Sequence, residues 1–275
     1  MNLVTEVGFW SEIKLEIIRE YASAYSQVLS AQKFPSLYHV YIDAFAGAGF
    51  HVSRKTGDWV LGSPLIALET IPPFKEYHFI DLDGGRASLL REAAGRYGSN
   101  VWVYEGNANQ VLLNDVFPRV RYEDYRRGLC LLDPYGLHYT WEVVSTAGKM
   151  RSIELFLNFP VAAMNRTVLL RDPSVADQRE IQRMTAFWGD DSWREAAYTT
   201  KRSLFGDLEK LENPAMAEAY RRRLQDVAGF NYVSEPLPMR NSKNAPLYYL
   251  ILASQKPAAS AIITDIFHKY RQRRR

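Results

Sequence analysis

Residues 41–49 read Tyr-Ile-Asp-Ala-Phe-Ala-Gly-Ala-Gly, an apolar run that ends in a carboxylate and then breaks at two glycines. Gly47 and Gly49 can adopt positive φ and carry no Cβ, so a ligand can lie directly against the main chain there. The carboxylate of Asp43 can accept hydrogen bonds from such a ligand. We therefore predict a buried strand over 38–43 followed by a nucleoside-binding loop, with Phe45 as a further candidate for the cofactor site.

Four more apolar segments follow this strand, at 77–81, 101–104, 129–132 and 153–159, and Asp81, Asn107 and Asp133 stand at the ends of three of them. Strands that alternate with helical segments predict an α/β, Rossmann-like fold, with a mostly parallel sheet covered by helices on both faces. Ligands bind such sheets at the carboxyl ends of the strands. We therefore expect these polar side chains and Asp43 to surround one crevice.

The rest of the chain is expected to be mainly helical. Apolar spacing predicts an amphipathic helix over 9–30, and Ser63 is placed to cap a second helix over 64–70. A third helix is expected over 86–96, a polar loop over 51–61, a last strand over 247–253 and a closing helix over 258–275. Charged helices without a strand are expected over 165–229, as an insertion or lid within a single domain over 1–275.

Composition limits the class of protein. The chain has 275 residues, 47% of them hydrophobic, and one cysteine, Cys130, so no disulfide can form within it. This favours a reducing cytoplasm, and with no signal-peptide pattern and no run of 18 apolar residues we expect a soluble protein without a membrane partner. The five histidines have no metal-ligand spacing, so no metal is expected.

The basic tail gives two readings. The net charge is +3, and five cations lie in the last seven residues: Lys269, Arg271, Arg273, Arg274 and Arg275. Such a run can contact nucleic acid. It can equally be the solvated end of a helix, where cations are favourable.

The glycine loop favours a nucleoside without a pyrophosphate. Dinucleotide-binding loops place a third glycine at the start of the next helix, whereas here that helix begins about a dozen residues later, at Ser63. S-adenosylmethionine needs no phosphate cradle. Asp81 can accept hydrogen bonds from both ribose hydroxyls, or else cap a helix, and Asn107 can bind the adenine edge, or else be a turn residue.

The fourth strand ends in Asp133-Pro134-Tyr135-Gly136. The Asp133 carboxylate and the carbonyl beside Pro134 offer two acceptors to an exocyclic amine, and Tyr135 can stack on a base swung out of its helix. The same tetrapeptide is also typical of a turn. The neighbouring His138 is a weaker candidate for the acceptor site.

Several motifs in this order resemble the bacterial three-Cys-motif partner protein family. They are 41–49, Gly62-Ser63-Pro64-Leu65, Phe79-Ile80-Asp81-Leu82-Asp83, Leu132-Asp133-Pro134-Tyr135-Gly136 and Asn158-Phe159-Pro160. That family is similar to class I S-adenosylmethionine-dependent methyltransferases. The resemblance implies that Asp43, Gly47 and Gly49 form the first cofactor motif, that Asp81 is the ribose ligand and that Asp133 to Tyr135 occupy the catalytic position. It also implies a neighbouring three-Cys-motif protein as a partner.

Three functions stay open from the sequence. The first is transfer of a methyl group from S-adenosylmethionine to an amino nitrogen, most plausibly of a nucleic-acid base. The second is a non-catalytic, cofactor-binding partner subunit, favoured because Tyr135 and Gly136 stand where base-specific amino-methyltransferases carry proline and an aromatic residue. The third is a metal-dependent nuclease or defence component that uses Asp43, Asp81 and Asp133 as ligands.

Overall fold

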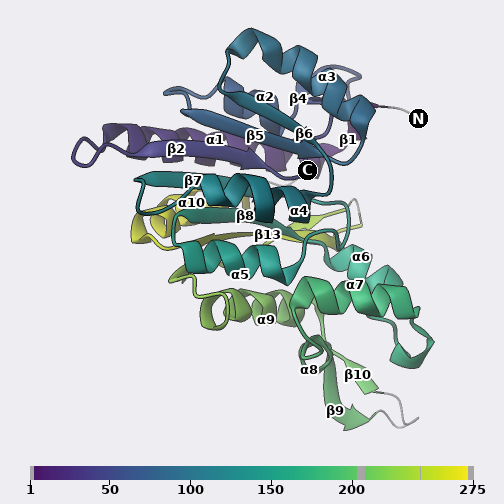
Figure 1. Cartoon of the computed structure of the whole chain (residues 1–275). Coiled ribbons are helices and arrows are strands. Elements are labelled where there is room, and N and C mark those ends of the chain that lie inside the picture. Colours follow the sequence, from purple (N-terminus) through teal and green to yellow (C-terminus); the bar gives the residue numbers. More distant parts are fainter. Residues whose placement is uncertain (1–2, 203–207, 242, 272–275) are drawn as a thin grey trace.

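A computed structural model describes residues 3–202, 208–241 and 243–271 (Figure 1). Its centre is a sheet in the order β11-β13-β8-β7-β2-β5-β6, with β12 also paired to β13. Strands β6, β5, β2, β7 and β8 are parallel, and β13 runs antiparallel to β8. The strands of this sheet are β2 (Tyr38–Asp43), β5 (Glu76–Asp81), β6 (Val101–Glu105), β7 (Arg126–Leu132), β8 (Ile153–Phe159), β11 (Tyr232–Val233), β12 (Leu237–Arg240) and β13 (Pro246–Ser254).

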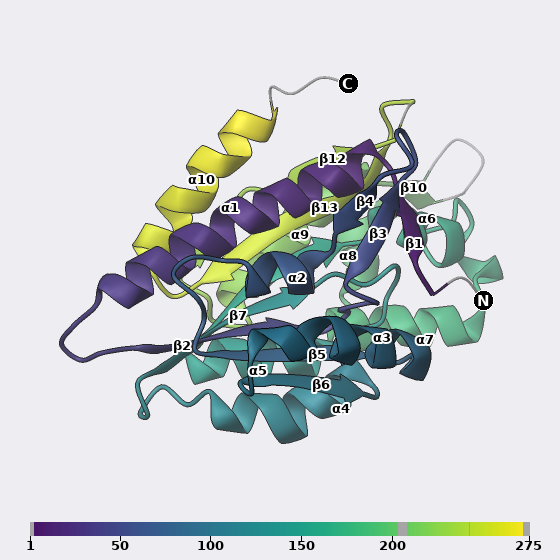
Figure 2. The same ribbon diagram turned by 90° about the horizontal axis from the view of Figure 1, so that it is seen from above.

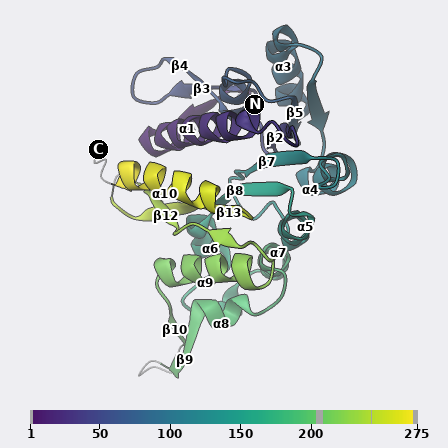
Figure 3. The ribbon, with the colours of Figure 1, turned by 90° about the vertical axis from the view of Figure 1, so that its left-hand side faces the viewer.

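The parallel strands are apolar because helices cover both of their faces. On one face, α1 (Phe9–Ala31) and α10 (Pro257–Arg271) lie side by side (Figure 2), together with α2 (Ser63–Leu68). On the other face lie α4 (Ala108–Val111) and α5 (Trp141–Met150) (Figure 3). The sequence-predicted α/β class and the parallel strands are confirmed.

The register brings the carboxyl ends of the strands together. Asp43, the last residue of β2, pairs with Phe79 on β5 and with Leu131 on β7. Asp81 and Asp133 each come two residues after these partners. The end of β2 and the polar residues that follow β5 and β7 therefore lie at one edge of the sheet.

The predicted polar loop over 51–61 is wrong. It forms β3 (Phe50–Ser53) and β4 (Trp59–Leu61), and β3 pairs in parallel with β1 (Thr5–Val7). The Ser53 hydroxyl donates to Glu12 Oε1 (2.7 Å), which ties this small sheet to α1.

The cap prediction for Ser63 is also wrong, because Gly62 occupies the N-cap of α2. The helix predicted over 86–96 begins earlier, with α3 (Gly84–Ala94) capped by Asp83.

The segment 165–229 is not purely helical. Four helices, α6 (Val161–Thr167), α7 (Gln178–Trp188), α8 (Trp193–Ala197) and α9 (Asn213–Asp226), are accompanied by an antiparallel pair that the sequence did not indicate. Its strands are β9 (Tyr198–Arg202) and β10 (Leu208–Lys210), between α8 and α9 in the chain. From here on we call 165–229 the insertion. In the basic tail, Lys269 pairs with Glu20 and Arg271 with Glu235, whereas Arg273, Arg274 and Arg275 lie outside the described residues.

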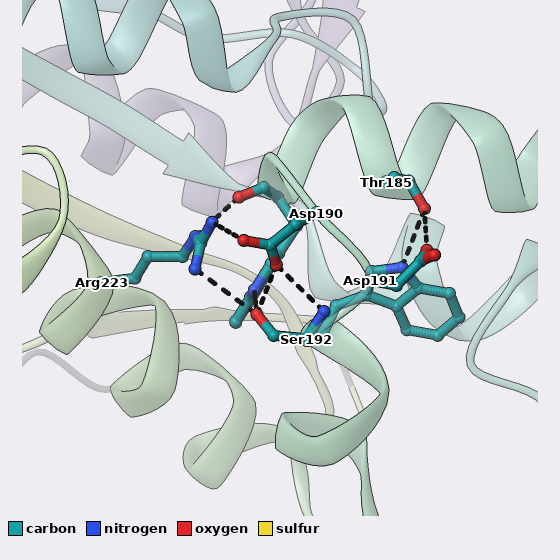
Figure 4. A network of polar contacts seen from close by, with 7 residues as sticks. Thr185, Asp190, Asp191, Ser192 and Arg223 are labelled. Atoms are coloured by element: carbon teal, nitrogen blue, oxygen red, sulfur yellow. Dashed lines mark hydrogen bonds and ion pairs between the residues drawn. The ribbon is translucent and has the colours of Figure 1, made fainter.

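One polar network holds the helices of the insertion together (Figure 4). The guanidinium of Arg223, on α9, donates to the carbonyl of Trp188 (2.7 Å) and to the hydroxyl of Ser192 (3.4 Å) and pairs with Asp190 (2.5 Å). The same guanidinium lies 4.6 Å from the ring centroid of Trp141 on α5. We call this group the Arg223 clamp, because it fixes α7, the turn before α8 and α9 against the domain.

Candidate active site

A cavity of about 510 Å³ lies at the carboxyl ends of the parallel strands. Its walls come from the glycine loop after β2, from the residues that follow β5, β6, β7 and β8, from α1 and α6, and from the start of β13. Of the predicted site residues, the cavity is lined by Phe45, Gly47, Asp81, Asn107, Asp133, Pro134 and Tyr135. Asp43 and Gly49 do not line it.

The two glycines of the loop serve different purposes. Both have positive φ, +65° at Gly47 and +85° at Gly49, as predicted. A Cβ on Gly47 would meet no atom within 4 Å, whereas one on Gly49 would lie 3.0 Å from Leu90 Cδ1. Gly47 therefore leaves room at the cavity wall, and Gly49 allows the loop to pack on α3.

Asp43 supports the loop from behind. Its carboxylate is completely buried and accepts a hydrogen bond from the backbone N–H of Phe45 (3.2 Å). Burial raises the pKa of Asp43 to about 7, while Ser63 and the Phe45 N–H favour the ionised form and limit the rise. We expected Asp43 to contact the ligand directly. Its buried position behind the loop, outside the cavity lining, does not support that prediction.

Asp81 links the first two loops of the cavity. Its carboxylate accepts from the backbone N–H of Gly47 (2.9 Å) and from that of Asp83 (2.8 Å). Asn107 lines the cavity and caps α4 by accepting from the N–H of Asn109 (3.0 Å). Asn107 thus has the turn role weighed as its alternative, whereas the helix cap weighed for Asp81 is supplied by Asp83 instead. Both Asp81 and Asn107 line the cavity.

Asp133 lies between two partners. Its Oδ1 accepts from the Asn158 amide (2.9 Å), and its Oδ2 pairs with Lys14 of α1. Burial alone would lower the pKa of Lys14, but the carboxylate of Asp133 outweighs it and raises that pKa above its ordinary value. The Lys14 ammonium also lies 5.6 Å from the ring centroid of Tyr248. Since a carboxylate has about four acceptor positions, Asp133 keeps capacity for a further donor.

The sequence reasoning missed Lys14, Tyr248 and Arg166, although all three line the cavity. Lys14 had one detectable signal, because it lies on α1 between the buried residues Ile13 and Leu15. Tyr248 and Arg166 come from β13 and α6, and no local pattern directs them to this cavity. His138 also lines it, as considered above, whereas Tyr139 is buried and donates to the Asn158 carbonyl (3.2 Å).

The trio needed for the nuclease hypothesis is not assembled. Across 3–202, 208–241 and 243–271, no three His, Cys, Asp or Glu side chains are grouped so that they could hold a metal ion. Asp81 accepts hydrogen bonds from backbone N–H groups and Asp133 pairs with a cation, Lys14, instead of facing other carboxylates. Within the same ranges, no helix combines the length and apolar character needed to cross a membrane.

The strand order and the antiparallel β13 decide the fold type. This is the class I methyltransferase fold. No protein-family model matches the sequence, and no curated protein matches it. Among solved structures, protein LPL1258 of Legionella pneumophila, assigned to family-model DUF519, is similar with a TM-score of 0.52 and 11% identity, over 93% of this chain and 91% of that one.

A second similar structure is Trm1 from Pyrococcus horikoshii, in complex with S-adenosyl-L-methionine. It gives a TM-score of 0.47 and 11% identity, and the alignment covers 91% of this chain but only 56% of that one. Both identities are far too low to carry a function across, so the likeness to LPL1258 concerns the fold alone and the likeness to Trm1 carries no argument. Membership of the three-Cys-motif partner protein family is not shown by any of these comparisons.

Proposed function

We propose that this protein binds S-adenosylmethionine in the cavity and transfers its methyl group to an amino nitrogen, most plausibly of a nucleic-acid base. The observation that supports this most directly is the meeting of Gly47, Asp81 and Asp133 at one cavity at the carboxyl ends of parallel strands. That edge is where α/β sheets of this kind bind their ligands. We also propose that the protein belongs to the three-Cys-motif partner protein family and acts in the cytoplasm.

The residues present fit this cofactor. The open space next to Gly47 leaves the loop backbone accessible, and the volume of about 510 Å³ is within the usual range for small-molecule sites. Asp81 and Asn107 would hold the ribose and the adenine, and the 44–48 loop would hold the amino-acid part. S-adenosylmethionine, when bound, supplies a methyl group that an amine nitrogen takes with its lone pair as the C–S bond breaks.

Asp133 would orient the acceptor. Its carboxylate would accept a hydrogen bond from the amine and hold the nitrogen lone pair in line with the methyl group, and such alignment is worth several kcal/mol. Asn158 and Lys14 fix the carboxylate in place from two sides. The nitrogen loses one proton to water after transfer.

A partner subunit without catalysis of its own is the second candidate. It is favoured by the engagement of both Asp133 oxygens by Asn158 and Lys14 and by the Tyr135-Gly136 departure from the amino-methyltransferase motif. In this case the partner would be a neighbouring three-Cys-motif protein. Methyl transfer by the purified chain, measured with and without that neighbour, separates the two candidates.

The cofactor site is tested with Gly47→Val and a matched control, Gly57→Val. Gly57 lies between β3 and β4, also has positive φ (+76°) and open space at its Cβ position, and does not line the cavity. Both variants carry the same backbone strain, on the order of 1–3 kcal/mol. We expect Gly47→Val to weaken S-adenosylmethionine binding in calorimetry at least tenfold and Gly57→Val to leave it unchanged. Equal affinities for wild type and Gly47→Val would contradict the proposed site.

A further inference from the structure

The cavity has a second half beyond Asp133, which we call the acceptor half. It is lined by Asp133–Tyr135 after β7, Asn158 and Pro160 after β8, Ala162, Ala163 and Arg166 of α6, and Leu247 and Tyr248 of β13. We propose that the acceptor half binds an unpaired base of a polynucleotide, with Lys14 excluding cationic amines and Arg166 holding a backbone phosphate. This inference rests on the proposed function and adds which residues select the base and hold the polynucleotide that carries it.

Lys14 favours a neutral amine over a positively charged one in the acceptor half. Its ammonium neutralises Asp133, the carboxylate nearest to the reacting position, and the pair is only 14% and 17% exposed. A protein lysine is an ammonium ion at neutral pH, so it would bring a third positive charge into a site that already holds the Lys14 cation and receives a sulfonium. The exocyclic amine of a base is neutral and carries no such cost. The acceptor half therefore favours a base over a lysine side chain.

Arg166 favours a negatively charged molecule as the carrier of the amine. It is exposed on α6, and no residue that the structure describes forms an ion pair or side-chain hydrogen bond with it. Around the cavity, Lys14, Arg86 and Arg166 are cations and Asp81 and Asp133 are anions. With a sulfonium added, the surplus is positive, which favours an anionic carrier such as a phosphodiester chain.

The side chains of the acceptor half are suited to a flat ring. Ala162 and Ala163 lie four and three residues before Arg166, on the same side of α6, so small side chains leave space between the cation and Asp133. Tyr135 lines the cavity and is 75% exposed. An exposed aromatic ring beside a pocket is suited to stack on a base, and a base must leave its helix to reach such a pocket.

The test measures binding and transfer separately. Fluorescence anisotropy with 12-nucleotide single-stranded DNA and RNA probes, at several salt concentrations, compares wild type with Arg166→Gln. The matched control is Arg179→Gln, since Arg179 is an exposed cation on α7 that does not line the cavity. We expect Arg166→Gln to weaken binding about tenfold at low salt and to reduce the salt slope by about one. Arg179→Gln should change neither, and the better of the two probes identifies the carrier as DNA or RNA.

Three results distinguish this inference from the proposed function. If the protein binds S-adenosylmethionine but neither probe, or methylates poly-lysine in preference to oligonucleotides, the inference is overturned and the cofactor site stands. If Arg166→Gln binds the probes as tightly as wild type, the assigned phosphate contact is wrong. If probe binding depends on Arg166 in a protein that does not bind S-adenosylmethionine, the polynucleotide surface is upheld and the proposed function fails.

Discussion

The cavity and the Arg223 clamp are both built from charged and aromatic side chains, but they use them in opposite ways. In the clamp, one guanidinium is shared by the Trp188 carbonyl, Ser192 and Asp190 and is stacked on Trp141. Around the cavity, Arg166 has no partner among the described residues, and the buried Arg86 Nε and Asn158 Oδ1 have none either. Buried polar atoms without partners are costly, and a ligand that fills the cavity can supply partners to Arg86 and Asn158. The Arg223 guanidinium already has its partners, which makes the clamp a structural support.

Asp133→Asn gives the largest expected effect on function. The substitution keeps the shape and one acceptor oxygen for Lys14 but removes the charge that holds the amine. We expect the rate of methyl transfer to fall at least 100-fold, comparable to the loss of other orienting groups, with cofactor affinity in calorimetry within about threefold of wild type. The control is Asp115→Asn, an exposed carboxylate away from the cavity. Unchanged transfer by Asp133→Asn would remove Asp133 from the proposed chemistry.

Arg223→Met gives the largest expected effect on stability. Methionine keeps an apolar stem between the tryptophans but removes the hydrogen bonds to Trp188, Ser192 and Asp190. Since the Arg223 side chain is only 13% exposed, we expect a loss of about 2–3 kcal/mol in thermal or urea unfolding. Its neighbour Arg222 pairs with Glu218 at the surface and is 69% exposed, so Arg222→Met should cost less than about 0.5 kcal/mol.

The contrast between the cavity and the Arg223 clamp is wrong if a substitution in the clamp also changes cofactor binding. Cofactor affinity should be the same in Arg223→Met and wild type below the melting transition, because none of the clamp residues lines the cavity. A loss of affinity as large as that of Gly47→Val would show that the insertion shapes the cofactor site. The insertion, which already reaches the cavity through Arg166, would then also support the cofactor site.

The sequence predicted the parallel strands well because their evidence is local. Each is a continuous apolar run, and β2 begins and ends where its pattern does. The small sheet was missed because β1 and β3 pair across more than forty residues of sequence, and His51 and Ser53 make β3 look polar. Strands β9 and β10 were missed because they are short and lie between charged helical segments, whose periodicity determined the prediction for the whole of 165–229. Pairing partners that come from distant segments cannot be read from one segment's periodicity.

The residues of the candidate site also fall into those that the sequence predicts and those that it does not. Asp81, Asn107 and Asp133 were predictable because strand ends in a parallel sheet share one edge. Lys14 and Arg166 were not, because their role depends on how α1 and α6 pack against that edge. Asp43 and Gly49 belong to the predicted loop but face away from the cavity, since the loop must also be supported from the core side. Local chemistry thus identifies the loop, and packing decides which of its residues meet the ligand.

Asp43→Asn gives the smallest expected effect, and one that depends on pH. Asp43 is a buried carboxylate behind the loop, and it lacks the close cation partner that Asp190 has in the clamp. Its pKa rises from an ordinary value of 3.8 to about 7 in the folded protein, so between these values the folded state binds a proton that the unfolded state does not. Its contribution to stability therefore falls as pH rises from about 4 to 7.

Asn cannot ionise, so Asp43→Asn should lose this dependence. We expect the variant to gain melting temperature relative to wild type at pH 8 and to gain less or nothing at pH 5, with Asp115→Asn showing equal differences at both values. The same shift at both pH values would mean that Asp43 is ionised throughout.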